Sequence, residues 1–371
     1  MRNFIFVCIF ICFVSCHHHQ QSDGFTIDVR RGSITEANIT EIAEHIKAIP
    51  LETTQESLLA NTFSISKHDS LLFVLSNERI YRFGTDGKFH KRLTNRGQGP
   101  GEIDALRLDF DKKNETIVII GSGNRILHIN YDGTPIKATR FSGDRIIDFA
   151  IFNDYFWAIV NIPFWNQRRL FDLSLLQINR DWEVLDTIKL HTSESGFTRM
   201  GMWHQYLSAV DGDLFFNYPS VHYEPIVRDT LFRITGSELD PVLRVNYGQR
   251  GRYHRLNNQG WTILNGYIFL PSPISMLNGR FLTASFLQAS ETRGGGSHRY
   301  EFWYDFVTGK QYLLRGGFTD NVYQTGQVLL QRFGLLSGKL YFYKWPHELD
   351  ESPLEREDED NPIVFIVTLK E

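Results

Sequence analysis

The sequence predicts an all-β protein, a single six-bladed β-propeller of antiparallel blades that is closed by an N-terminal strand. Two observations favour this fold. A strand–turn–strand pattern recurs along the 371-residue chain, and aromatic side chains make up 14% of it, which is typical of a large β-rich core. A helical pattern is confined to Ile34–Ile46, so we expect one short helix near the N-terminus.

The recurring pattern is clearest in two segments that are 46 residues apart. "RIYRFGTDGKF" begins at Arg79 and "RILHINYDGTPI" begins at Arg125, and looser copies begin at Leu175, Asp229 and Tyr300. Asp-Gly between two alternating apolar runs is a strong signal for a β-hairpin. A repeat of about 45–60 residues with three or four antiparallel strands has the size of a propeller blade.

The strands group into six blades. An unpaired strand, His45–Glu52, precedes the first blade, and an open sheet edge would leave backbone donors unsatisfied. We therefore expect this strand to pair with the last blade and close the ring. The expected blades are 60–95, 103–141, 145–191, 204–247 and 262–315, with a sixth made of 320–345 and the terminal strand from Asn361.

The first sixteen residues have the pattern of an export signal. Arg2 precedes an uncharged apolar run, Phe4–Val14, that is too short to span a membrane. The run ends in Phe-Val-Ser-Cys, which resembles the lipobox of bacterial lipoproteins and predicts lipidation of Cys16; an ordinary signal peptide cut elsewhere is the alternative. We divide the chain into a signal, 1–16, a tether with a short helical lead-in, 17–44, and a propeller domain, 45–371.

Cysteine usage and charge narrow the possible partners. All three cysteines lie within the first sixteen residues, so disulfides cannot stabilise the folded domain. The formal net charge is −4 and the chain has no basic cluster, which argues against nucleic acid as a partner. We expect contact with the membrane through the N-terminal lipid only.

Several segments carry a family resemblance. They are "IPLETTQESLLAN" (49–61), the strand and turn at 80–88, "GQGPGEI" (97–103), "RDTLFRITGSELDPVLRVNYG" (228–248) and "DNPIVFIVTLK" (360–370). The sequence resembles the six-bladed β-propeller lipoproteins abundant in Gram-negative gut anaerobes, which are distantly similar to NHL-repeat propellers. The resemblance implies the fold and an exported lipoprotein of the cell envelope, on the periplasmic or surface side of the outer membrane. It implies no catalytic residues.

The glycine-rich segment "RGQGPGE" connects the first predicted blade to the second. A phosphate-binding loop is excluded because no Lys-Ser/Thr pair and no helical pattern follow it. Two interpretations stay open. Glu102 accepts backbone N–H bonds and braces a structural turn, or Arg96, Gln98 and Glu102 contact a ligand.

Catalytic motifs are absent from the sequence. It contains no G-x-S-x-G elbow, no H-E-x-x-H pair and no cysteine nucleophile in the domain. We therefore predict a non-catalytic binding or scaffolding lipoprotein without a cofactor or metal, which presents a propeller face to a glycan, peptide or protein partner. Trp203, His204 and Arg252 are further candidate ligand contacts, because Trp and Arg are frequent in binding hot spots. The alternative is a propeller hydrolase or lyase with a channel metal held by His204, His254 and carboxylates.

Overall fold

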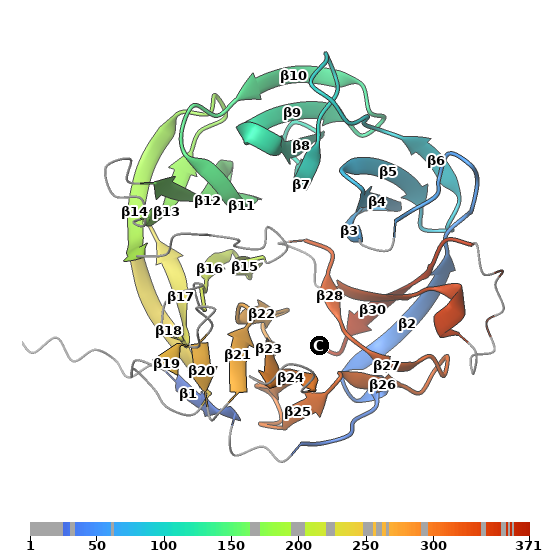
Figure 1. Cartoon of the computed structure of the whole chain (residues 1–371), viewed down its shortest axis with the longest axis vertical. Helices are drawn as coiled ribbons and strands as arrows, with labels where there is room; N and C mark the ends of the chain where they lie inside the picture. The colour runs from blue at the N-terminus through green and yellow to red at the C-terminus, as the bar shows by residue number, and fades with distance from the viewer. Residues whose placement is uncertain are drawn as a thin grey trace, which may run out of the picture.

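The chain forms a ring of six antiparallel sheets around a central axis, the six-bladed propeller that the sequence predicts (Figure 1). In the computed structural model, the residues described are 25–29, 34–60, 63–163, 171–193, 205–219, 227–247, 255–256, 262–264, 267–290, 296–334, 339–349, 354, 357 and 360–371.

Blades one to four each contain four consecutive strands, numbered here from the innermost to the outermost (Figure 1). Each strand pairs with the next one in the chain, so these blades are simple meanders. Their strands are β3 (Phe63–His68), β4 (Leu71–Ser76), β5 (Arg79–Gly84), β6 (Phe89–Arg92); β7 (Ala105–Asp111), β8 (Thr116–Gly121), β9 (Arg125–Asn130), β10 (Pro135–Arg140); β11 (Arg145–Phe152), β12 (Tyr155–Pro163), β13 (Phe171–Ile178), β14 (Val184–Ser193); and β15 (Leu207–Val210), β16 (Asp213–Phe216), β17 (Thr230–Thr235), β18 (Glu238–Asn246).

Blade five departs from this pattern because its inner strand is split into two parts, β21 and β22, that both pair with β23. Two short strands extend the sheet beyond β21, and a two-stranded ribbon precedes blade six. The strands are β19 (Arg255–Leu256), β20 (Thr262–Leu264), β21 (Tyr267–Pro271), β22 (Ser275–Leu277), β23 (Phe281–Ser290), β24 (Ser297–Asp305) and β25 (Gln311–Arg315), followed by the ribbon β26 (Phe318–Asp320) and β27 (Gly326–Val328).

Blade six closes the ring. Its strands β28 (Gln331–Arg332), β29 (Lys339–Lys344) and β30 (Ile363–Leu369) are completed by the N-terminal β2 (Ala43–Pro50), which pairs antiparallel with β30. The predicted clasp is confirmed. A shorter N-terminal strand, β1 (Phe25–Asp28), runs parallel to β18 and gives blade four a fifth strand.

The prediction of a helix within Ile34–Ile46 is wrong. In that stretch only η2 (Ile39–Glu41) makes a 3₁₀ turn, and β2 begins two residues later. The segment lies along blades five and six, where the Thr35 N–H donates to the Leu313 carbonyl at 2.8 Å. Sheet pairing satisfies backbone groups across the fold, and it outweighs the weak helical preference of a segment rich in β-branched residues. The other described 3₁₀ turns are η3 (Ser122–Asn124) and η4 (Pro346–Glu348).

The two Asp-Gly hairpins adopt the same geometry, 46 residues apart. In blade one, Gly84 N–H donates to the Lys88 carbonyl at 2.9 Å and Gly87 has φ +87°. In blade two, Asn130 N–H donates to the Thr134 carbonyl at 2.9 Å, and the glycine of that turn has φ +90°. This left-handed backbone suits glycine, so the repeat reflects a shared turn.

The hydrophobic core lies between the blades. Six clusters of buried side chains each join two neighbouring blades, and one of them joins blade one to blade six. In that cluster Phe63 and Phe83 pack with Tyr341 and Val364. The same interface carries a hydrogen bond of 3.0 Å from Ile65 N–H to the Tyr341 hydroxyl. The closed ring is therefore stabilised by packing between blades one and six as well as by the pairing of β2 with β30.

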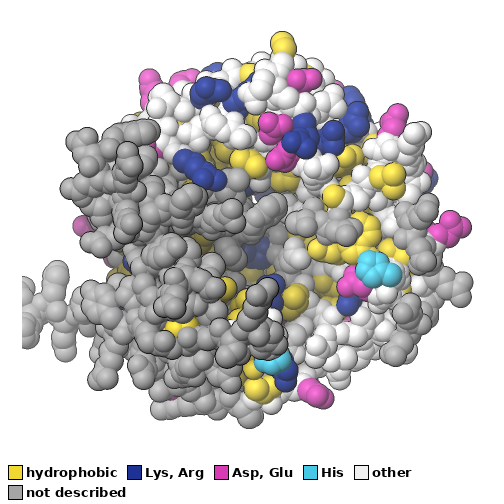
Figure 2. All heavy atoms as spheres, in the orientation of Figure 1, with side chains coloured by type: hydrophobic (Ala, Val, Ile, Leu, Met, Phe, Trp, Pro, Cys, Tyr) yellow, Lys and Arg dark blue, Asp and Glu magenta, His cyan; other side chains and the backbone are white. Residues whose placement is uncertain are grey.

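The two faces of the ring carry different connections. One face has tight turns between first and second strands and between third and fourth strands, such as 69–70 and 236–237. The other, here called the loop face, carries the connections between second and third strands and between blades. In the described part of the chain these include 77–78, 93–104 and 141–144. Figure 2 looks onto the loop face, which is hollowed at its centre.

Candidate functional site

The glycine-rich segment forms a braced turn on the loop face. The Gly99 N–H donates to Glu102 Oε2 at 3.0 Å, and the Glu102 N–H returns to the Gly99 carbonyl at 3.1 Å. Gly97 has φ +142°, and a Cβ there would lie 2.2 Å from Glu102 Oε2. The glycines therefore make room for the carboxylate, as the structural interpretation of this segment expects.

Arg96 and Gln98 belong to the same network. Arg96 Nη2 lies 2.7 Å from Glu78 Oε2, and its side chain is 45% exposed. Gln98 Nε2 donates to Asp104 Oδ2 at 3.5 Å, and its Oε1 accepts from Arg125 Nη1 at 3.1 Å. The contacts between these groups hold them in place, and a ligand-binding role for Arg96, Gln98 and Glu102 stays a prediction.

Arg125 is the member of this network that sequence reasoning missed. Its guanidinium also donates to the carbonyl oxygens of Gly97 at 3.2 Å and Gly99 at 3.3 Å, so blade two holds the connection that leads into it. A signal was present, since Arg125 opens the second copy of the repeat. Arg79, which opens the first copy, occupies the equivalent place.

A second group of charged side chains lies on the inner strands that surround the channel. Asp148 on β11 is 2% exposed and pairs with Arg107 on β7, with Nη1 and Oδ1 3.2 Å apart. Its other oxygen accepts the N–H groups of Tyr206 at 2.7 Å and Leu207 at 3.3 Å, at the start of blade four. The inner edge of a blade has no neighbouring strand, and this carboxylate satisfies two of its donors.

Two more inner-strand side chains satisfy backbone groups of other blades. Asp109 Oδ2 accepts the Ile151 N–H of blade three at 2.7 Å. Arg332 of blade six donates to the carbonyl oxygens of Gln205 at 3.2 Å and Leu207 at 3.1 Å, so it links two blades that are not neighbours. These polar contacts tie four of the six blades together around the channel.

Burial changes the pKa of two groups in this cluster. Desolvation of the carboxylate, with a smaller contribution from Asp148, raises the pKa of Asp109 to about 6. Desolvation also lowers the pKa of Arg332 to about 10, so its guanidinium keeps its charge at neutral pH. Figure 2 shows Lys and Arg side chains inside the central hollow. The inner strands contribute two arginines, Arg107 and Arg332, to the cluster around Asp148.

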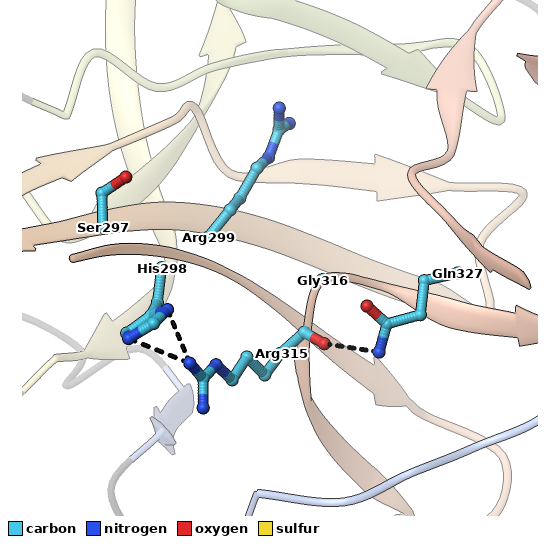
Figure 3. A pocket seen from close by; sticks show the side chains of 6 residues that line it. All are labelled: Ser297, His298, Arg299, Arg315, Gly316 and Gln327. Carbon is cyan, nitrogen blue, oxygen red and sulfur yellow. Dashed lines mark hydrogen bonds between the residues drawn. The ribbon is translucent and has the colours of Figure 1, made fainter. Parts of the chain in front are cut away.

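A recess of about 330 Å³ lies on the loop face at the outer part of blade five, next to the ribbon (Figure 3). The His298 ring and the Arg315 guanidinium point toward one another, with Arg315 Nη2 2.7 Å from Nδ1 and 2.9 Å from Nε2. Sequence reasoning considered Ser297 beside His298 as a catalytic pair and set it aside, and it did not link His298 with Arg315, because β24 and β25 bring these two together only when paired. The lining residues are Ser297, His298, Arg299, Arg315, Gly316 and Gln327.

Other predicted residues lie outside the described part of the chain. These are Cys16, Trp203, His204, Arg252 and His254, so their roles stay predictions. Within the described ranges, no group of three or more His, Cys, Asp and Glu side chains is placed to hold a metal ion. No helix in those ranges is long and apolar enough to cross a membrane.

Comparison with known proteins places the chain in a family. A family model described as "Domain of unknown function (DUF4934)" matches residues 24–368. The chain belongs to the DUF4934 family. No curated protein matches it.

Two solved structures are similar to this DUF4934 protein to different degrees. A crystal structure of a "Putative exported protein" from Bacteroides fragilis matches with a TM-score of 0.67 at 16% identity, covering 94% of this chain and 99% of that one. The Pan2 WD40 domain of Neurospora crassa covers 91% of this chain and 99% of that one, with a TM-score of 0.39 at 11% identity. At 16% identity, the likeness to the Bacteroides fragilis structure concerns the fold alone. The TM-score of 0.39 for the Pan2 domain is too low to support a shared fold.

Proposed function

We propose that this protein is an exported, lipid-anchored binding protein that receives a glycan, peptide or envelope protein on its loop face. The observation that carries the proposal is the difference between the two faces of the ring. The opposite face has tight turns such as 69–70, whereas the loop face carries the connections between blades, among them the twelve-residue connection 93–104 from blade one to blade two. Binding residues are frequently carried by long loops on a rigid scaffold, and a concave centre is a natural pocket.

The described residues supply the rigid scaffold. The turn around Glu102 is braced by Arg125, and the inner edges of several blades are joined by Asp109, Asp148 and Arg332. A preorganised face loses less conformational entropy when a ligand binds. This supports recognition as the role of the face.

A binding screen with a metal analysis tests the proposal. Purified protein is screened against glycan, peptide and envelope-protein collections, and its metal content is measured. We expect saturable binding of one ligand class that leaves the ligand chemically unchanged. Turnover of a ligand, or stoichiometric zinc or calcium that is lost on His204→Ala, would instead support the hydrolase or lyase alternative.

The lipid anchor has its own test. The lipobox pattern at Cys16 supports export followed by lipidation, and the structure similar in fold that is named a "Putative exported protein" agrees with export. Replacing Cys16 with alanine should therefore move the protein from the membrane fraction to the soluble envelope fraction. Continued fractionation with membranes after this change would contradict the lipid anchor.

A further inference from the structure

The recess on blade five combines two cationic or proton-donating groups on one side of a strand pair. His298 comes from the start of β24 and Arg315 from the end of β25, and Figure 3 shows their side chains meeting on the same side. Arg299, the next residue along β24, extends away from them (Figure 3). This alternation follows from the period of a strand, which sends neighbouring side chains to opposite faces.

The backbone at Arg315 is fixed by two hydrogen bonds. Gln327 Nε2 donates to the Arg315 carbonyl at 3.1 Å, and the Gly316 N–H donates to the Arg299 carbonyl at 2.9 Å. Gly316 has φ +83°, and a Cβ there would lie 2.3 Å from Gln327 Oε1. The turn after β25 therefore depends on glycine, and it presents Arg315 beside His298.

The described lining of the recess carries no negative charge. Among the residues that the structure describes, no acidic side chain lines the recess and Arg315 makes no ion pair with a carboxylate. A neutral imidazole has one acceptor nitrogen and one N–H. Arg315 Nη2 lies within 3 Å of both ring nitrogens, so the N–H of a neutral ring faces another donor, and an oxyanion between the two side chains would accept from both.

We propose that this recess binds a compact oxyanion, a carboxylate or sulfate group, between Arg315 and His298. The guanidinium supplies charge-assisted hydrogen bonds and the imidazole N–H supplies a further donor, an arrangement that suits oxyanions. The site would recognise a carboxylate or sulfate substituent on a ligand that binds to the loop face. It rests on the proposed function in that respect only, because a small anion can occupy it alone.

Titration of the full mature protein with sodium sulfate tests the site, with sodium acetate as a parallel series and sodium chloride keeping ionic strength constant. Binding is followed by NMR of ¹³C-labelled histidine rings, and the His298 signal is assigned by its loss in His298→Gln. We expect a saturable shift of the His298 signal in at least one series. The preferred anion shows whether the recess suits tetrahedral sulfate or planar carboxylate.

Matched charge variants make the test specific. Arg315→Gln should weaken binding at least tenfold, whereas Lys310→Gln removes the same charge from the turn that joins β24 and β25, outside the lining of the recess, and should change affinity less than twofold. Equal weakening by both variants would show general electrostatic attraction and overturn the site. A shift that never saturates in either series, or that persists in Arg315→Gln, would also overturn it.

The outcome separates this site from the proposed function. If sulfate or acetate binds while the screen finds no loop-face ligand, the recess stands and the proposed function fails. If a loop-face ligand binds while neither anion does, the recess alone is wrong.

Discussion

Replacing Asp148 with alanine removes the carboxylate that joins blades two, three and four at the channel. In the structure this side chain pairs with Arg107 and accepts the N–H groups of Tyr206 and Leu207. Without this carboxylate, the mostly buried guanidinium of Arg107 loses its ion-pair partner, and the backbone N–H groups of Tyr206 and Leu207 lose their acceptor. We therefore expect a large loss of stability from a single substitution.

The magnitude follows from the contacts. Hydrogen bonds to a charged group contribute about 1.5–3 kcal/mol each, and removing one partner of a buried ion pair costs about 3–5 kcal/mol. The contacts share one carboxylate and are not additive, so Asp148→Ala should lower the free energy of unfolding by about 3–5 kcal/mol. Asp148→Asn keeps one acceptor oxygen and should lose less.

Urea unfolding followed by tryptophan fluorescence measures the effect. Asp148→Ala should lower the midpoint strongly with an unchanged slope. Asp213→Ala is a matched control, because Asp213 also pairs with an arginine, Arg233 at 3.4 Å, but at an exposed site. The control should keep the wild-type midpoint. If Asp148→Ala unfolds at the same urea concentration as this control, the inner-edge contacts do not stabilise the ring as argued.

Two further substitutions test the core of blade five and the glycine loop. Burial raises the pKa of Glu301, which is 4% exposed, from its ordinary value of 4.5 to about 7; the stability that its protonation provides is complete below pH 4.5 and is lost as the pH rises through 7. Between pH 5 and 8 the wild type should therefore lose about 2 kcal/mol relative to Glu301→Gln in urea unfolding, and parallel pH profiles would contradict this. Gly97→Ala should cost about 1–3 kcal/mol, because alanine is strained at φ +142° and its Cβ would displace the Glu102 carboxylate, whereas Gly123→Ala (φ +67°, with no atom within 4 Å of the added Cβ) should cost less. Equal midpoints for the two alanine variants would refute the bracing role of Glu102.

Local signals in the sequence account for the parts of the fold that were predicted. The Asp-Gly turns at Gly87 and Gly133 have a geometry set by a few adjacent residues, so their repeat located the first two blades. The clasp was predictable because a lone strand beside a ring with an open edge has one place to pair. The prediction of a helix over Ile34–Ile46 was wrong because this stretch pairs with residues of blades five and six, which lie far along the chain and leave no signal in the stretch itself.

The candidate site was harder to predict for the same physical reason. Asp148 and Arg107 lie on inner strands of different blades, and the residues of one strand do not indicate which residue of the other strand is the partner. Their one signal is a charge within an apolar strand, which indicates a partner without identifying it. The bracing role of Glu102 was one of the two interpretations that the sequence left open, and it could be named because the partner, Gly99, lies three residues away.

Affinity measurements on face-specific variants test the central claim, that the loop face binds the ligand, most directly. With the ligand found by the screen, Trp203→Ala and Arg252→Ala should each weaken binding by about 1–3 kcal/mol while the melting temperature stays near that of the wild type. Val307→Ser changes an exposed apolar side chain in the turn between β24 and β25 on the opposite face and should leave affinity unchanged. Unchanged affinity in both loop-face variants, together with weaker binding in Val307→Ser, would place the ligand on the other face and contradict the account.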